Sequence, residues 1–193
     1  MNIGLISLGC AKNQVDSEMM LGYFKERGYN IVTQLEEADI IVVNTCGFIN
    51  SAKQEAIDTI LEMADYKING KCKYLIATGC LVKRYKDEIL KELPEIDLCI
   101  GVDEYDKFDE IFSNFLNQKT LCHNLSFNDR LISTKFPLAY IRISDGCDNR
   151  CSYCAIPFIR GNHKSRKMED ILEEVKSLAS QGVSEFCLIA QDT

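Results

Sequence analysis

Three cysteines stand close together in the stretch GCDNRCSYCAIP, which spans residues 146–157. Cys147, Cys151 and Cys154 follow the pattern C-x-x-x-C-x-x-C. Cysteine thiolates bind iron-sulfur clusters, and a four-iron cube needs one ligand for each of its irons. Three thiols on one loop can therefore hold three irons and leave the fourth iron open to a substrate or a cofactor.

Other kinds of thiol site remain open for this loop. Structural zinc requires four nitrogen or sulfur ligands, and the histidine near the loop is His163, after Cys154. A bacterial ferredoxin site has the spacing C-x-x-C-x-x-C and a further Cys-Pro pair, which differs from the pattern found here. Inert buried thiols are the remaining alternative.

A second set of three cysteines is spread along the chain. Cys10, Cys46 and Cys80 each follow an apolar run that is typical of a strand, and each lies beside a glycine. Loops at the carboxyl ends of parallel strands share one edge of a sheet, where α/β folds bind their ligands. One such cysteine is often a small buried hydrophobe. Three at equivalent positions predict a shared ligand site, with the glycines allowing close backbone approach.

The composition limits the class of protein. Ten cysteines among 193 residues, about 5%, is below the roughly 8–10% of a disulfide-stapled scaffold. In a reducing compartment these thiols indicate metal or redox chemistry. The net charge of −7 argues against broad binding of nucleic acid. We expect the remaining cysteines to be structural or incidental; they are Cys72, Cys99, Cys122 and Cys187.

A basic stretch follows the three-cysteine loop. Its side chains could contact an anionic partner or a cofactor carboxylate, or they could form a solvated loop before the next helix. They are Arg150, Arg160, Lys164, Arg166 and Lys167.

Hydrophobic patterning predicts an α/β fold with alternating strands and helices. Strands are expected at 3–8, 31–33, 39–44, 74–78, 98–101, 138–144 and 185–190, and helices at 16–27, 51–66, 81–93, 105–116 and 167–181. Continuous apolar strands between helices predict a parallel sheet covered on both faces, a three-layer arrangement. The sequence shows neither a membrane-spanning apolar run nor a signal peptide, so we expect a cytoplasmic protein without a membrane partner.

The same pattern predicts two units. Residues 1–122 form the first, the polar stretch 123–136 is a linker or long loop, and residues 137–193 form a strand, a helix and a strand. A β-α-β unit of this size does not close a core by itself, so the second unit is expected to be truncated.

The three-cysteine loop resembles the signature of the radical S-adenosylmethionine superfamily, C-x-x-x-C-x-aromatic-C, with Tyr153 at the aromatic position. The resemblance implies the start of a partial β/α barrel of the TIM type. It also implies that Cys147, Cys151 and Cys154 hold a 4Fe-4S cluster whose open iron binds S-adenosylmethionine, with Tyr153 beside the cofactor. Cleavage of that cofactor then gives a 5'-deoxyadenosyl radical.

The whole chain resembles the methylthiotransferase family. Four motifs carry this likeness in the family's order: SLGCAKNQVDSE at 7–18, NTCGFINSAKQEAI at 44–57, TGCLVKRYKDEI at 78–89 and RISDGCDNRCSYCAIPFIRG at 142–161. The resemblance implies a methylthiotransferase N-terminal domain. It further implies a second 4Fe-4S cluster, whose open iron carries the sulfur or methylthio group, on Cys10, Cys46 and Cys80.

Within this family, SLGCAKN and the ending IAQDT look like the branch that modifies an aspartate of small-subunit ribosomal protein S-twelve. This implies that one S-adenosylmethionine methylates sulfur, while a second yields the radical that abstracts hydrogen from the aspartate β carbon. An electron donor such as flavodoxin or ferredoxin is implied as a partner.

Alternatives to the ribosomal-protein branch are methylthiolation of a modified adenosine beside the tRNA anticodon and a threonylcarbamoyl-adenosine branch. Two alternatives that are not enzymes also remain: an iron-sulfur module for electron transfer or sensing, and a zinc-binding structural protein.

Overall fold

The computed structural model describes residues 1–120 and 124–193. Its first unit contains a parallel five-stranded sheet in the order β2-β1-β3-β4-β5. The strands are β1 (Asn2–Ser7), β2 (Asn30–Ile31), β3 (Ile40–Thr45), β4 (Tyr74–Gly79) and β5 (Leu98–Gly101). Every residue of β3 is buried, which explains its unbroken apolar run because both faces of a parallel sheet are covered.

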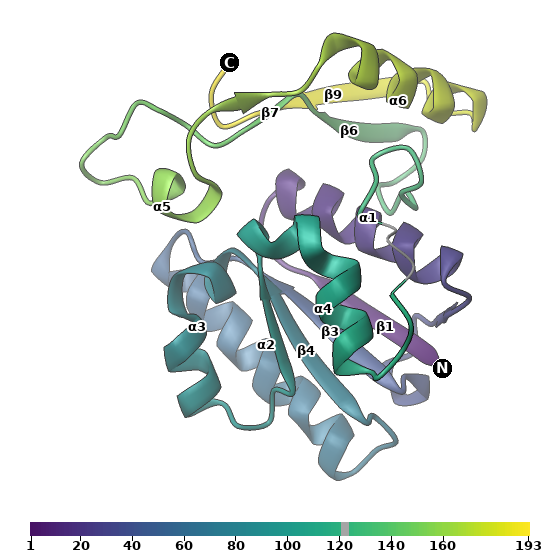
Figure 1. Cartoon of the computed structure of the whole chain (residues 1–193), viewed down its shortest axis with the longest axis vertical. Helices are drawn as coiled ribbons and strands as arrows, with labels where there is room; N and C mark the ends of the chain where they lie inside the picture. Colours follow the sequence, from purple (N-terminus) through teal and green to yellow (C-terminus); the bar gives the residue numbers. More distant parts are fainter. Residues whose placement is uncertain (121–123) are drawn as a thin grey trace.

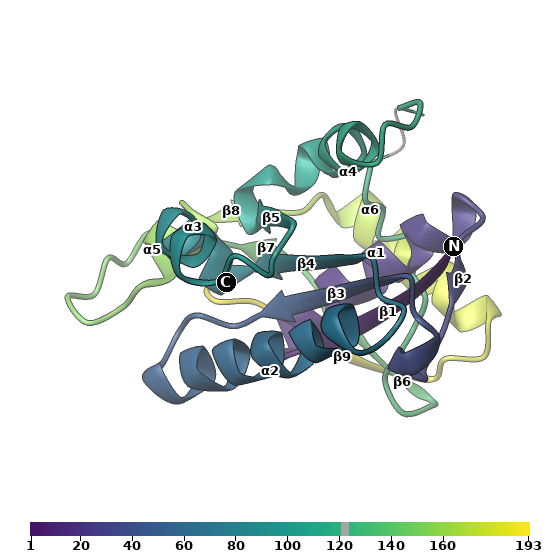
Figure 2. The same ribbon diagram turned by 90° about the horizontal axis from the view of Figure 1, so that it is seen from below.

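Helices cover both faces of this sheet, as Figure 1 and Figure 2 show. Ile41 and Val43 pack with α2 (Asn50–Ile68) and α3 (Cys80–Glu92). Ile40 and Val42, which point the other way, pack with α1 (Ala11–Glu26) and α4 (Phe108–Phe115). Successive side chains of a strand alternate between faces, so one short apolar run supplies both cores. The predicted three-layer α/β fold is confirmed.

The second unit lies above the carboxyl-terminal edge of the sheet (Figure 1). Strand β6 (Leu138–Arg142) pairs in parallel with β9 (Glu185–Ile189), and α6 (Met168–Ser180) connects them. Ala139, Ile141, Leu178 and Val183 form its small core. Three short elements lie between β6 and α6: β7 (Ser144–Asp145), α5 (Ile156–Arg160) and β8 (Lys164–Ser165).

Several predicted boundaries were wrong for identifiable reasons. Helix α1 begins at Ala11 rather than residue 16, because its first turns bury polar side chains and hide the apolar period. The single helix expected at 105–116 is a 3-10 turn, η2 (Val102–Lys107), followed by α4. Another 3-10 turn, η1 (Leu35–Glu37), lies in the loop before β3. The two-residue strands β7 and β8 are too short to show periodicity.

The polar stretch 124–136 contains neither helix nor strand, yet it is anchored to both units. Arg130 is fully buried at its side chain and lies 2.6 Å from a carboxylate oxygen of Glu18 in α1 and 2.8 Å from one of Glu174 in α6. It also donates to the Tyr140 carbonyl of β6. One charged residue of this stretch, Arg130, is therefore buried in ion pairs with both units, whereas most of its other polar residues are exposed. His123, predicted as the first linker residue, lies outside the described residues, as does Cys122.

Candidate functional site

The first cysteine set lies at the carboxyl ends of three neighbouring strands. Cys10 precedes α1 after β1, Cys46 follows β3, and Cys80 opens α3 directly after β4. Strands β1, β3 and β4 are adjacent and parallel, so the structure places all three positions at one sheet edge. Cys10 is exposed, whereas Cys46 and Cys80 are buried.

Glycines make the close packing of these loops possible. A Cβ atom at Gly9 would lie 2.5 Å from the Cβ of Cys46 and 3.0 Å from its Sγ. At Gly79 it would lie 2.4 Å from the Thr45 carbonyl oxygen. Both glycines have positive φ, +92° and +103°, a conformation that other residues rarely adopt. The turns next to Cys10 and Cys80 therefore require glycine.

Asn13 connects the three cysteine loops. Its Nδ2 donates to the carbonyls of Leu8, after β1, and Thr45, at the end of β3, at 3.0 Å each. Its Oδ1 lies 3.4 Å from Cys80 Sγ. The residue is fully buried, and its position in the first turn of α1 aims the amide into the space between the loops. Sequence analysis missed this role; the placement of a polar residue three positions after Cys10 was the available signal.

The second cysteine set lies on the loop between β7 and α5. The Cys147 sulfur lies 3.4 Å from Asn149 Nδ2 and 3.7 Å from a carboxylate oxygen of Asp192, which follows β9. The Cys154 amide donates to the Cys151 carbonyl at 3.0 Å and closes a turn. The loop thus lies at the carboxyl ends of two parallel strands, where β/α barrels place their chemistry.

This loop is open to solvent. Cys151 is exposed, Cys147 and Cys154 are half-buried, and the Tyr153 side chain is 89% exposed. Across the described ranges, 1–120 and 124–193, no three His, Cys, Asp or Glu side chains meet closely enough to hold one metal ion. A cube of four irons is wider than a single ion and keeps its thiolates farther apart. Soft thiolates at both places match the ligand type of such a cluster.

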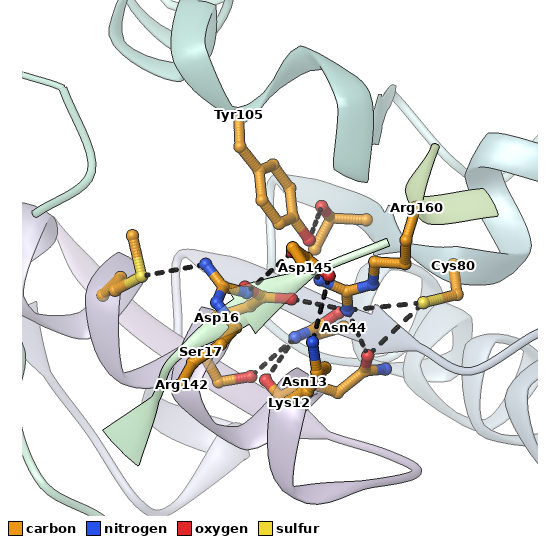
Figure 3. Close-up of polar contacts among 12 residues, drawn as sticks. Lys12, Asn13, Asp16, Ser17, Asn44, Cys80, Tyr105, Arg142, Asp145 and Arg160 are labelled. Atoms are coloured by element: carbon orange, nitrogen blue, oxygen red, sulfur yellow. Dashed lines mark hydrogen bonds and ion pairs between the residues drawn. The ribbon is translucent and has the colours of Figure 1, made fainter. Parts of the chain in front are cut away.

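Helix α5 joins the two cysteine sets. Its last residue, Arg160, directs its guanidinium to the sheet edge (Figure 3). Nη2 donates to Asn13 Oδ1 at 2.9 Å and to Asp16 Oδ2 at 2.7 Å, and it lies 3.5 Å from Cys80 Sγ. The residue that closes the helix after the three-cysteine loop therefore contacts a thiol of the other set.

Burial and charge act against each other around this contact. Burial raises the pKa of the Cys80 thiol to about 11, while the nearby Arg160 cation acts in the opposite direction. Burial also tends to raise the pKa of Asp145, but the cations of Arg160, Arg142 and Lys12 outweigh it and hold that pKa below its usual value. The sheet edge that carries Cys10, Cys46 and Cys80 is thus a low-dielectric region rich in positive charge.

The predicted basic stretch divides into two groups. Arg160 and Arg166 turn inward: the side chain of Arg160 is 3% exposed, and Arg166 pairs with the buried Glu174 and stacks on the Phe127 ring. Arg150, Lys164 and Lys167 are exposed. The stretch is therefore not one solvated basic surface, because two of its arginines neutralise carboxylates of α1 and α6.

The other described cysteines lie away from both sets. Cys72 and Cys99 are buried in the core that α2 and α3 form with the sheet, and Cys187 is exposed on β9. Each is a free thiol. Their positions agree with the structural or incidental role expected of them.

Two family models match the chain. The model described as Uncharacterized protein family UPF0004 matches residues 2–101, and the Radical SAM superfamily model matches residues 141–193. These ranges correspond to the five-stranded unit and to the unit that carries the C-x-x-x-C-x-x-C loop.

Curated relatives match across both units. The chain is 52% identical to the Ribosomal protein uS12 methylthiotransferase RimO of Acetivibrio thermocellus, over 98% of this chain and 45% of that protein. It is 55% identical to the protein of the same name from Alkaliphilus oremlandii, over 100% of this chain and 44% of that protein. The chain spans about half the length of the curated relatives it matches.

Among solved structures, the radical S-adenosylmethionine methyltransferase TsrM of Kitasatospora setae, with cobalamin and a [4Fe-4S] cluster bound, has a TM-score of 0.60 at 12% identity. That match covers 98% of this chain and 47% of TsrM. Such a likeness shows the fold alone. The chain belongs to the family described as Uncharacterized protein family UPF0004, and its sequence matches the amino-terminal half of the RimO-type radical S-adenosylmethionine methylthiotransferases.

Proposed function

We propose that the protein is a methylthiotransferase that modifies the β carbon of an aspartate in ribosomal protein uS12, the S-twelve protein of the small subunit. The observation that carries this proposal is the 52–55% identity, across both cysteine sets, to relatives named for that activity. The reaction class is a radical S-adenosylmethionine transfer. The competing proposal is that the protein belongs to the branch of the family that acts on tRNA.

We propose two 4Fe-4S clusters as cofactors. Cys147, Cys151 and Cys154 would hold one, with Tyr153 beside S-adenosylmethionine, and Cys10, Cys46 and Cys80 would hold the other. When bound, these groups supply electron transfer, hydrogen-atom abstraction and the methylthio sulfur. The residue types support this assignment, because three thiols in each set leave one iron of a cube open.

The protein's own side chains shape both places. Asn149 donates to Asp192 at 2.9 Å and lies beside Cys147, which ties the open loop to the end of β9. Arg160 of the second unit and Asn13 of the first unit both contact the buried Cys80 thiol and cover it from solvent. Hydrogen-atom abstraction needs no general base, so no side chain is assigned that role. Each side chain named here orients a ligand or excludes solvent.

We further propose a cytoplasmic location, where the ribosomal substrate is found, and a small electron donor such as flavodoxin or ferredoxin. None of the described helices is long and apolar enough to cross a membrane. Reduction of the cluster by purified flavodoxin or ferredoxin, followed by optical spectroscopy, tests the donor.

Deletion of the gene from its host tests the substrate. Mass spectrometry of ribosomal proteins and of tRNA nucleosides should show that uS12 loses the methylthio mass and that tRNA keeps its own. Complementation with the wild-type gene should restore the uS12 modification, and complementation with a Cys151→Ala variant should not. Loss of a methylthio nucleoside from tRNA, with uS12 unchanged, would assign the protein to the tRNA branch.

A separate experiment distinguishes the enzyme from an electron-transfer or sensing module. Anaerobic reconstitution should give about eight irons and eight sulfides per chain. Addition of S-adenosylmethionine to the reduced protein should change the EPR spectrum and release 5'-deoxyadenosine. An unchanged spectrum without that product contradicts the enzyme proposal, and zinc without sulfide contradicts both cluster assignments.

A further inference from the structure

We propose that Arg160 is a positioning residue for the Cys10, Cys46 and Cys80 site, although it belongs to the unit that carries the other cysteine set. This inference rests on the proposed function, because it assumes that these three thiols hold a cluster. Arg160 would set the charge and the hydrogen bonding around that cluster. It would also hold the three-cysteine loop in a fixed position relative to that cluster.

The position of Arg160 brings its guanidinium against a thiol of the other cysteine set. Arg160 ends α5, six residues after Cys154, and its Nη2 lies 3.5 Å from Cys80 Sγ. The same nitrogen contacts Asn13, which itself lies 3.4 Å from that sulfur. A cation and an amide from two different units therefore converge on one thiol, as the close-up in Figure 3 shows. Side chains that contact a ligand sulfur orient it and tune the group it binds.

Two aspartates, Asp16 and Asp145, hold the Arg160 guanidinium in place. Its side chain is 3% exposed, and the fully buried Asp16 of α1 pairs with it at 2.7 Å. Asp145, just before the three-cysteine loop, lies 3.4 Å from its other terminal nitrogen. Contacts on both sides of the guanidinium restrict its rotamers, which is the pre-organisation that a positioning residue needs.

The ion-pair network around Arg160 carries more positive than negative charge. Lys12, Arg142 and Arg160 meet Asp16 and Asp145 in this buried network, which gives three cations against two carboxylates. One positive charge is left over within a low-dielectric region. A thiolate-ligated cluster at the sheet edge is an anionic group that offsets it. A cluster beside Cys80 would therefore supply the negative charge that balances this network.

A measurable consequence follows for the cluster. Hydrogen bonds to ligand sulfurs and nearby positive charge favour the reduced state and raise the reduction potential. Removing the guanidinium should therefore shift the potential of this cluster to more negative values. A residue that only stabilised the fold would not produce that selective shift.

The test uses full-length protein in which Cys147, Cys151 and Cys154 are replaced by alanine, so that one cluster remains to be observed. Arg160→Met is compared with Arg142→Met. Both arginines pair with Asp16 and Asp145, but it is Arg160 that also reaches Cys80, with Nη2 lying 3.5 Å from Sγ. Redox titration followed by EPR should show a negative shift and altered g-values for Arg160→Met, and a clearly smaller change for Arg142→Met at equal iron content.

The outcomes separate the two proposals. Absence of any cluster in the triple-alanine background refutes the proposed second cluster itself. A cluster whose potential and EPR spectrum are the same in Arg160→Met, or shift equally in Arg142→Met, overturns the role of Arg160. If Arg160→Met fails to fold, Arg160→Lys is compared with Arg142→Lys. A shift confined to Arg160→Lys supports the proposal, and equal potentials refute it.

Discussion

Asp16 of α1 accepts a hydrogen bond from Arg160 of α5 at 2.7 Å, and the aspartate is fully buried. The other carboxylate oxygen of Asp16 pairs with Arg142 at the end of β6. One carboxylate of the first unit therefore holds two arginines of the second. The helix that begins after Cys10 and the loop that carries Cys147 are fixed to each other through this side chain.

Replacement of Asp16 by asparagine should destabilise the protein strongly. The change keeps the side-chain size but removes the buried carboxylate that lies nearest to both arginines and leaves them only Asp145, at 3.4 and 3.5 Å. We expect a loss of about 3–5 kcal/mol in the free energy of unfolding. Chemical denaturation followed by circular dichroism measures it. Glu92→Gln is the matched control, because Glu92 and its partner Lys91 are exposed and their ion pair should add nothing measurable. Equal stability of the two variants would contradict the structural role of Asp16.

Arg130→Met should loosen the attachment of the two units. The substitution removes the cation that lies between Glu18 and Glu174, so the expected loss is about 3–5 kcal/mol. Native-state hydrogen exchange should show faster exchange in α6 and β6 than in β3 and β4. The double variant Arg130→Met/Glu18→Gln should recover part of the loss because it removes an unpaired buried carboxylate. A loss below about 1 kcal/mol would show that 124–136 is an ordinary linker.

Gly79→Ala should strain the backbone and should also displace the loops that carry Cys46 and Cys80. Gly79 and Gly28 both have positive φ, but a Cβ at Gly79 meets the Thr45 carbonyl at 2.4 Å, whereas nothing lies within 4 Å of one at Gly28. Strain from positive φ costs about 1–2 kcal/mol in Gly28→Ala and about 1–3 kcal/mol in Gly79→Ala, because φ +103° and ψ −160° lie in a region that is essentially restricted to glycine. Gly79→Ala should in addition lose about half of the reconstituted iron, since it displaces Cys80. Full iron content in Gly79→Ala would refute this reasoning.

The free thiols of cluster-free protein should react with iodoacetamide in a defined order. Burial raises the pKa of Cys99 to about 11, so its thiolate becomes abundant only as the pH exceeds that value. Burial also raises the pKa of Cys72. Cys187, which is exposed, should be alkylated before Cys72 and Cys99 at pH 8, and peptide mapping by mass spectrometry checks the order. Rapid labelling of Cys99 at pH 8 would contradict its burial in the native core.

Local features of the chain were predictable because they depend on short-range pattern. Apolar runs such as residues 39–44 predicted buried parallel strands, and the spacing of Cys147, Cys151 and Cys154 predicted a shared ligand without reference to the fold. The edge position of Cys10, Cys46 and Cys80 followed from the parallel arrangement of the strands, since parallel strands end at one edge of the sheet.

Contacts between distant segments depended on tertiary structure. The start of α1 at Ala11 could not be predicted from periodicity, because Lys12, Asn13 and Asp16 are buried against partners more than thirty residues away in sequence. For the same reason Arg130 resembled a linker residue and Arg160 part of a solvated basic stretch. A buried charge has the same sequence letter as an exposed one, and its partner is found only when the chain folds. The sequence by itself thus determined which cysteines are candidate ligands, while the folded chain decided which charges surround them.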